Sequence, residues 1–364
     1  MGLLTPVLRS RAVAALTSPH GIDRYLEQVN PMWAAHEVRA RVVDVRREVD
    51  VPGHPAVTTL TLQPTSTWAG HRAGQHVTVG VELGGRRVTR VFTVSSAESN
   101  AGDRITLTVR ADSTGPGSVS RFLAEDAHPG TLLHLSQAEG DFTLPHRVPE
   151  RILLVSGGSG ITPVMSMLRS LQRRTHRGRI AFLHFARSPE HVIYRDELAD
   201  IARTGYGVDL HVLHPSEGDP YVSPAFLERL VPGYRDVPAW ACGPHSLIEA
   251  VQAAYGVSTS STNEGPLHVE YFKPPKPVGT GGGELTFARS GRTVANSGGL
   301  LLDQAEAAGL RPESGCRMGI CFSCTVRKTD GTVRNVLTGE TSSAPDEDIR
   351  ICVSTAEGDC SLSL

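Results

Sequence analysis

The sequence predicts a multidomain protein that joins an all-β barrel, an α/β domain with a parallel sheet and a small α+β domain. Three observations support this prediction. Short strands with alternating apolar residues fill the region up to residue 135, and short apolar runs then alternate with helical segments up to residue 255. Five of the six cysteines lie near the end of the chain.

The composition is that of an ordinary globular protein, with 39% hydrophobic and 20% charged residues among 364. A net charge of −2 gives no indication of a nucleic-acid partner. The apolar stretch 3–16 is interrupted by Pro6, Arg9 and Arg11 and is too short to span a membrane. Because no secretory signal is recognised, the cysteines indicate metal ligation in a reducing compartment, and we expect a cytoplasmic protein.

Changes in the sequence pattern divide the chain into five segments. Residues 1–36 carry weak helical signals, and an arm that is folded over the body or partly disordered is favoured over a membrane-surface helix. The other segments are a barrel at 37–148, an α/β domain at 149–272, a linker at 273–283 and a cysteine-bearing domain at 284–364. The linker reads KPPKPVGTGGG, with stiffening prolines followed by flexible glycines.

The elements of each domain are predicted from apolar periodicity and turn residues. In the barrel we expect strands at 39–46, 56–62, 76–83, 88–95, 104–109 and 131–135, with a helical turn at 119–124. In the α/β domain we expect strands at 152–156, 180–185, 208–213 and 239–242 and helices at 163–173, 195–204, 224–230 and 246–255. In the last domain we expect strands at 284–288, 292–296, 325–327 and 332–335 and a helix at 300–308.

The most specific motif is formed by Cys316, Cys321, Cys324 and Cys352. The spacing is C-x4-C-x2-C, then 27 residues, then the fourth cysteine, which is the plant-type ligand pattern of a [2Fe–2S] cluster. Structural zinc is the alternative, but zinc favours paired C-x2–4-C units over three cysteines on one loop. Cys360 lies outside the spacing and is not expected to be a ligand.

A glycine-rich turn comes after the first parallel strand and opens a helix. Gly157, Gly158 and Gly160 let a phosphate approach the backbone. Thr162 is expected to cap the helix, and Pro163 suits its first turn. The turn is therefore a predicted nucleotide site, with a tight β–α turn that binds no ligand as the alternative.

Two further stretches offer the cation, aromatic face and hydroxyl groups that a flavin needs. One is Arg90-Val91-Phe92-Thr93 on a barrel strand, and the other is Gly117-Ser118-Val119-Ser120 at the start of a short helix. Taken alone, the first stretch is better explained as an ordinary strand and the second as a β-turn with a helix cap. Cys242-Gly243-Pro244 ends the fourth parallel strand, where ligands bind in such sheets. Its thiol is either a substrate-side group or a small buried hydrophobe.

Taken in order, these motifs resemble the ferredoxin-reductase superfamily, in the branch with a plant-type ferredoxin domain fused at the C-terminus. Arg90–Thr93 is similar to the family's R-x-Y-[ST] flavin motif, and Gly117–Ser120 to its G-x-x-S phosphate motif. Gly157–Pro163 and Cys242–Pro244 are similar to its nicotinamide motifs. The resemblance covers residues 38–364 and implies a flavin-binding antiparallel barrel, a nucleotide-binding parallel-sheet domain and a β-grasp ferredoxin domain.

The resemblance also implies roles for the residues of the flavin strand. Arg90 would bind the flavin phosphates or ring edge, Phe92 would stack on the isoalloxazine, and Thr93 would approach flavin N5. Val91 belongs to the same motif, and Val109 would add backbone contacts. Phe92 stands where the family usually has Tyr, so stacking is kept but a hydroxyl contact is lost.

Further roles concern the phosphates and the nicotinamide. Gly117, Ser118 and Ser120 would hold the flavin pyrophosphate, and Cys242 would lie near the nicotinamide ring and help place its hydride. Glu270-Tyr271-Phe272 is similar to an E-x-F segment of the family whose role is less defined. FAD is the flavin that the family usually carries, with FMN as the alternative.

The choice of nucleotide depends on the residues directly after the second parallel strand. Arg187 and Ser188, and farther along Arg195, suit a 2′-phosphate, and no acidic residue comes directly at the strand end. We therefore expect NADPH in preference to NADH. The alternative is that Arg195 and Glu197 form only the solvated first turn of a helix.

These observations predict a reductase that moves electrons from NADPH through FAD and a [2Fe–2S] cluster to a separate oxygenase, hydroxylase or membrane acyl desaturase. Within the family, the chain most resembles actinobacterial reductases of acyl-desaturase or hydroxylase systems, so any peripheral membrane association would run through the partner. The alternatives are a flavin and iron–sulfur redox sensor without turnover, and a zinc-stabilised binding module.

Two hypotheses concern the partner. Residues 284–364 hold 8 basic and 11 acidic residues, and Asp346-Glu347-Asp348 precedes Cys352 closely, so an acidic face is expected to steer a basic partner. The linker is expected to let the cluster domain swing, so that shortening residues 278–283 should slow reduction of the partner but not hydride transfer.

Overall fold

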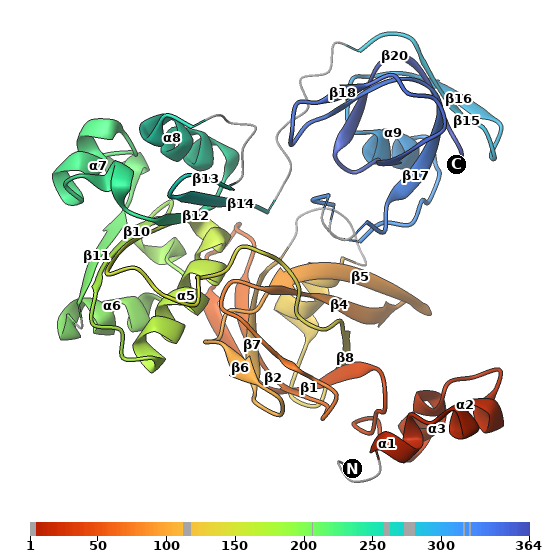
Figure 1. Cartoon of the computed structure of the whole chain (residues 1–364), viewed down its shortest axis with the longest axis horizontal. Helices are drawn as coiled ribbons and strands as arrows, with labels where there is room; N and C mark the ends of the chain where they lie inside the picture. The colour runs from red at the N-terminus through yellow and green to blue at the C-terminus, as the bar shows by residue number, and fades with distance from the viewer. Residues whose placement is uncertain are drawn as a thin grey trace. The chain divides into compact units, whose positions relative to one another are not determined.

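The computed structural model describes residues 5–111, 118–205, 207–257, 263–272, 281–315, 317–319 and 322–364. The chain forms two compact units, one made of residues 1–243 with 265–270 and the other of residues 244–264 with 271–364. Figure 1 shows the elements of both. In the part of the chain that is described, no helix has the length and apolar character needed to cross a membrane.

The first unit begins with three short helices, α1 (Thr5–Leu8), α2 (Arg11–Thr17) and α3 (Ile22–Val29). The Asp23 carboxylate accepts hydrogen bonds from the backbone N–H groups of Ala35, His36 and Glu37 at 2.5, 2.9 and 2.8 Å. Burial alone would raise the pKa of Asp23, but these three bonds hold it below its ordinary value. Buried Arg39 of the barrel also donates to the Trp33 carbonyl at 2.6 Å. The arm is therefore folded onto the barrel.

Six antiparallel strands form the barrel, as the apolar alternation predicts. They are β1 (Val38–Val49), β2 (Val57–Pro64), β4 (His76–Leu83), β5 (Arg86–Thr93), β7 (Ile105–Arg110) and β8 (Leu132–Leu135), in the order β5-β4-β8-β1-β2-β7. A bridge between Val94 and Leu107 joins the two edges. The barrel domain also contains a small strand pair, β3 (Gly70–His71) and β6 (Ser99–Asn100), and two short helical turns, α4 (Val119–Arg121) and η1 (Phe122–Asp126). Fully buried Leu60, Leu62 and Trp68 lie in its core.

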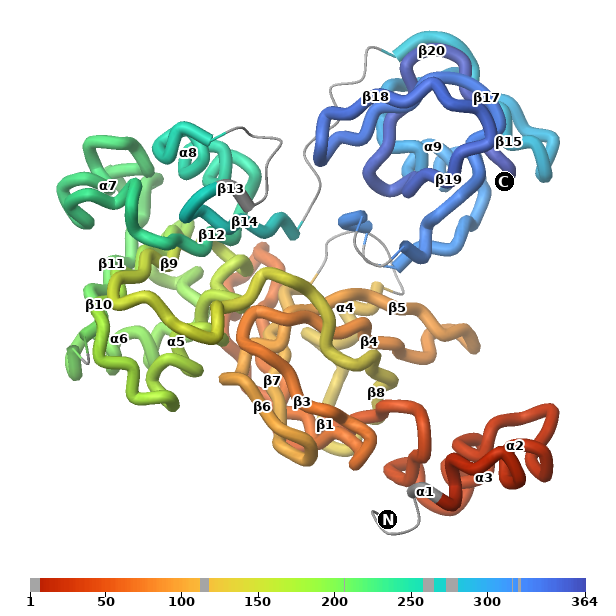
Figure 2. The backbone as a smooth tube through the Cα atoms, viewed as in Figure 1, coloured from red at the N-terminus to blue at the C-terminus, as the bar shows by residue number. Residues whose placement is uncertain are grey.

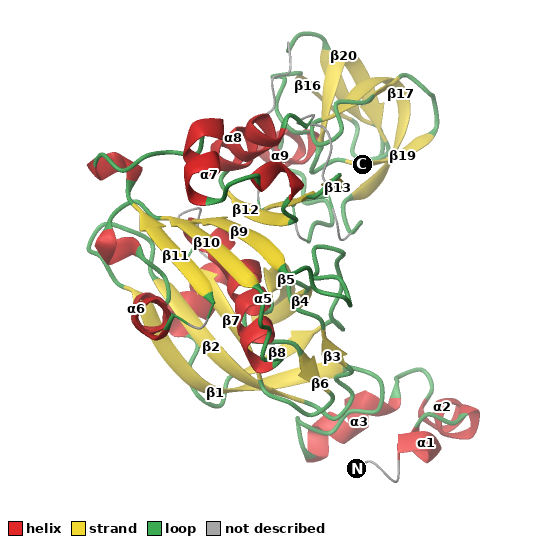
Figure 3. Cartoon of the chain, turned by 60° about the vertical axis from the view of Figure 1, so that its left-hand side comes forward, coloured by secondary structure: helices red, strands yellow, loops and turns green. Residues whose placement is uncertain are grey.

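The α/β domain of the first unit has a central parallel sheet. The strands are β9 (Arg151–Gly157), β10 (Arg179–Phe185), β11 (Val208–Leu213) and β12 (Ala239–Gly243), joined by β14 (Leu267–Tyr271), in the order β11-β10-β9-β12-β14. The helical elements are η2 (Gly158–Gly160), α5 (Ile161–Arg173), η3 (Pro189–His191), α6 (Arg195–Thr204), η4 (Pro215–Glu217), α7 (Pro224–Leu230) and η5 (Tyr234–Asp236). Figure 3 shows α5 and α6 on one face of the sheet and α7 on the other, as right-handed crossovers require.

The strand order of this sheet reverses between β9 and β12. The chain runs from β9 outward to β10 and β11, and then returns to place β12 on the other side of β9. Ligands of such sheets bind beyond the carboxyl ends of the strands at this reversal. The predicted nucleotide motifs at Gly157 and at Cys242 end these two strands.

The second unit contains α8 (His245–Tyr255), β13 (Asn263–Glu264) and the cysteine-bearing domain. This domain is built from β15 (Glu284–Phe287), β16 (Arg292–Ala295), α9 (Leu301–Ala307), β17 (Thr325–Asn335), β18 (Thr341–Ser342), β19 (Glu347–Arg350) and β20 (Ser354–Leu362). The sheet order is β16-β15-β20-β17-β18, with β19 paired to β17 and β20 parallel to β15. Leu301 and Leu302 of α9 are buried with Phe287 in one core, which is the β-grasp arrangement.

Candidate functional site

Three separate segments converge at one side of the barrel, and the first is the Arg90–Thr93 motif on β5. Arg90 and Phe92 of β5 are half-buried and lie opposite Val79 and Val77 of β4, while Thr93 is buried. Opposite residues of an antiparallel pair point to the same face, so Arg90 and Phe92 share the face of the barrel core, and Phe92 packs against that core. The strand therefore combines a cation, an aromatic ring and a hydroxyl within four residues.

The phosphate motif lies against this strand, since α4 packs on β4, β5 and β7 (Figure 2). The Ser118 and Ser120 hydroxyls are 2.8 Å apart, and no side-chain capping bond from Ser118 to α4 is found in the described structure. Val109 is buried on the facing strand β7. Gly117 lies outside the described residues. The arrangement suits a flavin with its pyrophosphate at the two serines, and the roles of these residues stay predictions.

The glycine turn and Cys242 pack directly against each other. A Cβ on Gly160 would lie 2.3 Å from the Cys242 carbonyl oxygen, so only glycine fits there. Gly158 has a φ of +53°. The expectation that Thr162 caps the helix is wrong: Gly160 is the N-cap, and the Thr162 hydroxyl donates to the Ser159 carbonyl at 3.1 Å, because the helix begins two residues earlier than predicted. Pro163 lies in the first turn, as expected.

Two ionisable side chains lie near each other on adjacent strands: Cys242 is buried on β12, and Glu270 of β14 is half-buried with its Oε2 atom enclosed. Burial raises the pKa of the Cys242 thiol well above its ordinary value, and the neighbouring Glu270 raises it further. Burial also raises the pKa of Glu270 to about 8. Within the described residues, Oε2 of Glu270 has no hydrogen-bond partner. A thiol and a protonated carboxyl therefore lie together beside the glycine turn at neutral pH.

Helix α5 connects the glycine turn to the segment that comes after Thr93. The Ser166 hydroxyl donates to the Ser96 carbonyl at 2.6 Å, and Ser170 accepts from the Glu98 N–H at 2.8 Å. Arg169 donates to the Ser95 carbonyl at 2.5 Å. No sequence pattern indicates these contacts, because serine and arginine on a helix are usually solvated.

Arg169 is also the centre of a buried polar cluster. Its guanidinium contacts both carboxylate oxygens of Glu197 at 2.8 and 2.5 Å and lies 4.4 Å from the centre of the Tyr194 ring. The Tyr194 hydroxyl reaches Thr108 of β7 at 2.6 Å. Burial opposes the charge of Arg169, but the bonds to Glu197 raise its pKa. Glu197 is therefore more than part of a solvated turn, since its cluster joins the two domains.

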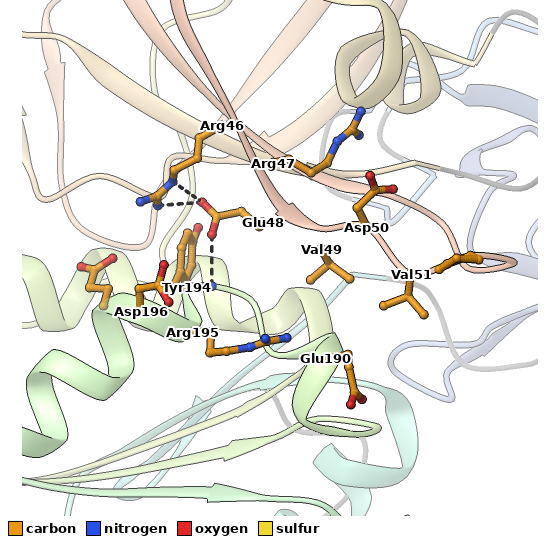
Figure 4. Close-up of a pocket in the computed structure, with 12 residues that line it drawn as sticks. Arg46, Arg47, Glu48, Val49, Asp50, Val51, Glu190, Tyr194, Arg195 and Asp196 are labelled. Carbon is orange, nitrogen blue, oxygen red and sulfur yellow. Dashed lines mark hydrogen bonds and ion pairs between the residues drawn. The ribbon is translucent and has the colours of Figure 1, made fainter.

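The predicted nucleotide residues after β10 face the β1–β2 turn of the barrel. Arg187 is exposed, and its Nη1 lies 3.0 Å from Nδ1 of His54 in that turn. Arg195 lines a pocket of about 510 Å³ formed by residues 46–52, Glu190 and residues 194–197. In Figure 4, Glu48 accepts from Arg46 and from the backbone N–H of Tyr194, and the Arg195 guanidinium lies in the space between Val49 and Glu190. Arg187 and Arg195 therefore lie at the same end of the sheet.

The sheet of the second unit brings two predicted cluster ligands to one end. Cys324 directly precedes β17 and Cys352 comes closely after β19, and these strands pair so that Thr325 lies opposite Arg350. The Ile351 N–H donates to the Cys324 carbonyl at 3.2 Å. Cys316 and Cys321 lie outside the described residues. No group of three metal-binding side chains is found among the residues that are described, which contain only two of the four predicted ligands.

The backbone around these cysteines is tightly specified. Gly319 has a φ of +78°, and a Cβ there would lie 2.9 Å from Val353. Arg350 donates to the Gly319 carbonyl and stacks on Phe322 at 4.9 Å from the ring centre. Cys360 is buried on β20, where burial raises its pKa to about 11. The three predicted ligands of the loop together with Cys352 would supply four thiolates, which is the donor set that a [2Fe–2S] cluster requires.

Comparison with known families agrees with this division. Residues 44–144 match the oxidoreductase FAD-binding domain, residues 154–253 the oxidoreductase NAD-binding domain, and residues 285–357 the 2Fe-2S iron-sulfur cluster binding domain. The chain is therefore a flavin- and nicotinamide-dependent oxidoreductase with a [2Fe–2S] domain, and not a zinc-stabilised module.

Individual relatives match most of the chain. An NADPH oxidoreductase of Mycobacterium tuberculosis (strain ATCC 25618 / H37Rv) is 35% identical over 97% of this chain and 91% of its own length. The reductase subunit of stachydrine N-demethylase from Rhizobium meliloti (strain 1021) is 31% identical over 82% of this chain and 88% of its own. The chain thus belongs to the ferredoxin-reductase superfamily, in the branch with a fused C-terminal ferredoxin domain.

A solved structure shows the same fold. Phthalate dioxygenase reductase, which is described as a modular structure for electron transfer from pyridine nucleotides to [2Fe-2S], superposes with a TM-score of 0.61. The alignment covers 90% of this chain and 98% of that one at 24% identity. The predicted order of antiparallel barrel, parallel-sheet domain and ferredoxin domain is confirmed.

Proposed function

We propose that the protein is the reductase component of an oxygenase, hydroxylase or acyl-desaturase system in the cytoplasm, and that it oxidises NADPH to reduce a separate acceptor protein. The observation that carries the proposal is the junction made by α5, which begins at the glycine turn and bonds through Ser166, Arg169 and Ser170 to the segment after Thr93. The names of the relatives support the class of partner. A membrane desaturase would make any membrane association indirect.

The proposed division of labour uses the domain boundaries 37–148, 149–272 and 284–364, which the matched family ranges support. When bound, NADPH, FAD and the [2Fe–2S] cluster together supply hydride transfer and its conversion to single electrons. Arg90, Ser118 and Ser120 would hold the flavin, Phe92 would cover its ring, and Thr93 would lie near N5. The turn at Gly157–Pro163 would bind the nicotinamide nucleotide next to Cys242.

The predicted acidic steering surface is partly neutralised within the domain. Asp348 pairs with Arg327 at 2.7 Å, and Glu347 lies 3.6 Å from the buried ammonium group of Lys328. The local field of the run Asp346-Glu347-Asp348 is therefore weaker than its three carboxylates alone would produce. Turnover with the partner is still expected to fall as salt rises, but gently.

The decisive experiment is an anaerobic titration of the purified protein with NADPH, followed by visible absorption. Flavin and cluster bands that both bleach would support the proposal, and rapid turnover with an added acceptor would exclude a redox sensor.

Cys324→Ser and Cys352→Ser should lose the cluster bands and bound iron, whereas Cys360→Ser should keep both. Loss of iron in Cys360→Ser would contradict the ligand assignment, and a clear preference for NADH would contradict the choice of nucleotide.

A further inference from the structure

The N-terminal arm, of which the structure describes residues 5–36, packs in the reverse of the ordinary way. Its helix α2 lies against both α1 and α3 (Figures 1 and 3). Among the described side chains of α2 and α3, the one that is buried is the carboxylate of Asp23, whereas Leu16 is 85% and Val29 is 72% exposed. Folded chains usually bury apolar side chains and leave charges in water. The arm therefore leaves an apolar surface uncovered.

The exposed apolar side chains of the protein are concentrated in this arm. Of the nine large apolar side chains that are exposed in the described part of the chain, five belong to it. They are Val7, Leu16, Tyr25, Val29 and Trp33. Tyr25 and Val29 are four residues apart on α3 and therefore lie on one face of that helix. Concentrated exposure of this kind marks a contact surface for another molecule.

Polar contacts fix the arm on the barrel. Asp23 accepts three backbone hydrogen bonds, and Nε of Arg9 donates to the Ala35 carbonyl at 2.5 Å. Buried Arg39 of β1 donates to the carbonyl of Trp33 at 2.6 Å. The apolar side chains are thus carried on an ordered scaffold, which lowers the entropy cost of binding.

The charges that the arm exposes are positive. Residues 5–36 contain three arginines and two carboxylates, and both carboxylates are already engaged. Asp23 is buried in its N–H bonds, and Glu27 lies 2.9 Å from the guanidinium of Arg39. Arg11 and Arg24 are exposed, and neither pairs with a carboxylate within the described residues. The surface therefore combines aliphatic side chains, two aromatic rings and uncompensated cations.

We propose that the arm is a membrane-surface anchor, which binds an anionic lipid bilayer with its apolar side chains among the acyl chains and its arginines against the lipid phosphates. Helices that carry Trp, Leu and Arg bind at this interface without crossing the bilayer, and Trp and Tyr favour the headgroup level. A second copy of the chain fits less well. A symmetric contact would bring the same arginines together, and the described arm has no unpaired carboxylate to meet them. The inference goes beyond the proposed function, since the chain itself makes the contact.

The test measures binding of the full-length holoprotein to lipid vesicles by co-sedimentation. The vesicles contain phosphatidylcholine alone or equal parts of phosphatidylcholine and phosphatidylglycerol. Binding is expected with the anionic vesicles and should weaken as salt rises.

Tryptophan emission reports the contact directly. Of the three tryptophans, Trp33 is exposed, whereas Trp68 and Trp240 are buried. Anionic vesicles should therefore shift the emission to shorter wavelength as Trp33 leaves water. Trp33→Phe should abolish this shift and keep the binding.

Substitutions in the arm should weaken binding in proportion to what they remove. Leu16→Ser and Val29→Ser should each lower the partition onto anionic vesicles about tenfold, the value of one large apolar side chain withdrawn from water. Arg24→Gln should lower it about fivefold. Leu132→Ser, at an exposed position on β8, is the matched control and should change nothing. Flavin spectra, melting temperatures and turnover of NADPH with ferricyanide should equal those of the wild type in every variant.

Three results would overturn the anchor: no binding of the wild type to anionic vesicles, equal binding to neutral ones, or binding that both Leu16→Ser and Val29→Ser retain. If the wild type binds no vesicle but sediments as a dimer that Leu16→Ser dissociates, the surface joins two copies of the chain and the anchor is wrong. Reduction of flavin and cluster by NADPH in a protein that binds no vesicle would leave the proposed function intact.

Discussion

At the scale of single residues, burial determines the chemistry at the end of β12. Glu270 has a pKa of about 8 in the folded protein against 4.5 for the exposed group, and burial is the cause. Between these values the folded state holds a proton that the unfolded state has lost, so the free energy of unfolding falls as pH rises from about 4.5 to about 8 and is then constant. Below this window Glu270 contributes no pH dependence.

The raised pKa of Glu270 predicts the behaviour of Glu270→Gln. The variant lacks the titration, so its stability relative to wild type should increase between about pH 5 and about pH 8 by roughly 1–3 kcal/mol. Thermal unfolding of the holoprotein at several pH values measures how the free energy of unfolding changes with pH. A constant free-energy cost of burying the amide does not alter this slope. Glu217→Gln, at an exposed position, should leave the slope unaltered. Parallel pH profiles for wild type and Glu270→Gln would show that Glu270 is ionised when buried.

The residue scale also shows what sequence reasoning can reach. The cysteine spacing, the glycine turn and the Arg90–Thr93 motif are local patterns, and each can be read from a few neighbouring residues. Thr162 is misassigned because a threonine before a proline looks like a cap, whereas the N-cap is Gly160, the residue that packs closely against the Cys242 carbonyl. That contact joins residues 82 positions apart and leaves no local trace.

At the scale of elements, α5 holds the α/β domain on the barrel. Arg169 is largely buried with Glu197, and removing one member leaves the other charge uncompensated. Arg169→Met and Glu197→Met should each destabilise the first unit by about 2–4 kcal/mol, and the double variant should cost less than their sum. Thermal unfolding of wild type, the two single variants and the double variant measures this double-mutant cycle. The exposed pair Arg203 and Asp200 on α6 is the control, for which about 0–0.5 kcal/mol is expected.

Additive losses in the Arg169 and Glu197 cycle would contradict this expectation, since they would show that the two charges act independently. A functional readout accompanies the cycle. If α5 positions the nucleotide against the flavin strand, the single variants should slow flavin reduction by NADPH while the flavin content is kept.

The strands that sequence patterns fail to predict are missed for a common reason. Strands β14, β19 and β20 are missed because their sequences, LHVEY, EDIR and STAEGDCSL, carry charged or small residues. Each is stabilised by pairing with a neighbour distant in sequence, such as β20 with β15 and β17. Strand β17 is predicted as two strands because Asp330-Gly331 looks like a turn, but the structure absorbs these residues in a bulge.

At the scale of the whole molecule, domain order can be predicted from sequence because each fold has its own periodicity, but contacts between domains cannot. Glu48 of β1 accepts from the N–H of Tyr194, and His54 contacts Arg187 across 133 positions. Such pairs are formed by polar residues on both sides, and polar residues are common everywhere along the chain. The same limit applies to the linker, because its predicted flexibility rests on amino-acid composition alone and not on any contact.

The described end of the linker alters the experiment that tests it. The Gly282 N–H donates to the Asn296 carbonyl at 2.9 Å, and the Glu284 N–H donates to Asp359 at 2.8 Å. A Cβ on Gly283 would lie 2.5 Å from Asp359. Residues 282–284 are therefore part of the cluster domain, and a deletion that removes 278–283 would damage its fold as well as shorten the connection.

A deletion confined to residues 275–280 should test only how far the cluster domain can move toward its partner. Shortening the connection lowers the chance that the cluster domain meets its partner, so the rate of partner reduction should fall by about tenfold or more. Flavin reduction by NADPH, measured by rapid mixing, should not change, nor should turnover with ferricyanide taking electrons from the flavin. A variant of the same length in which 275–280 are replaced by glycine and serine is the control. Equal loss of hydride transfer and partner reduction would refute a swinging cluster domain.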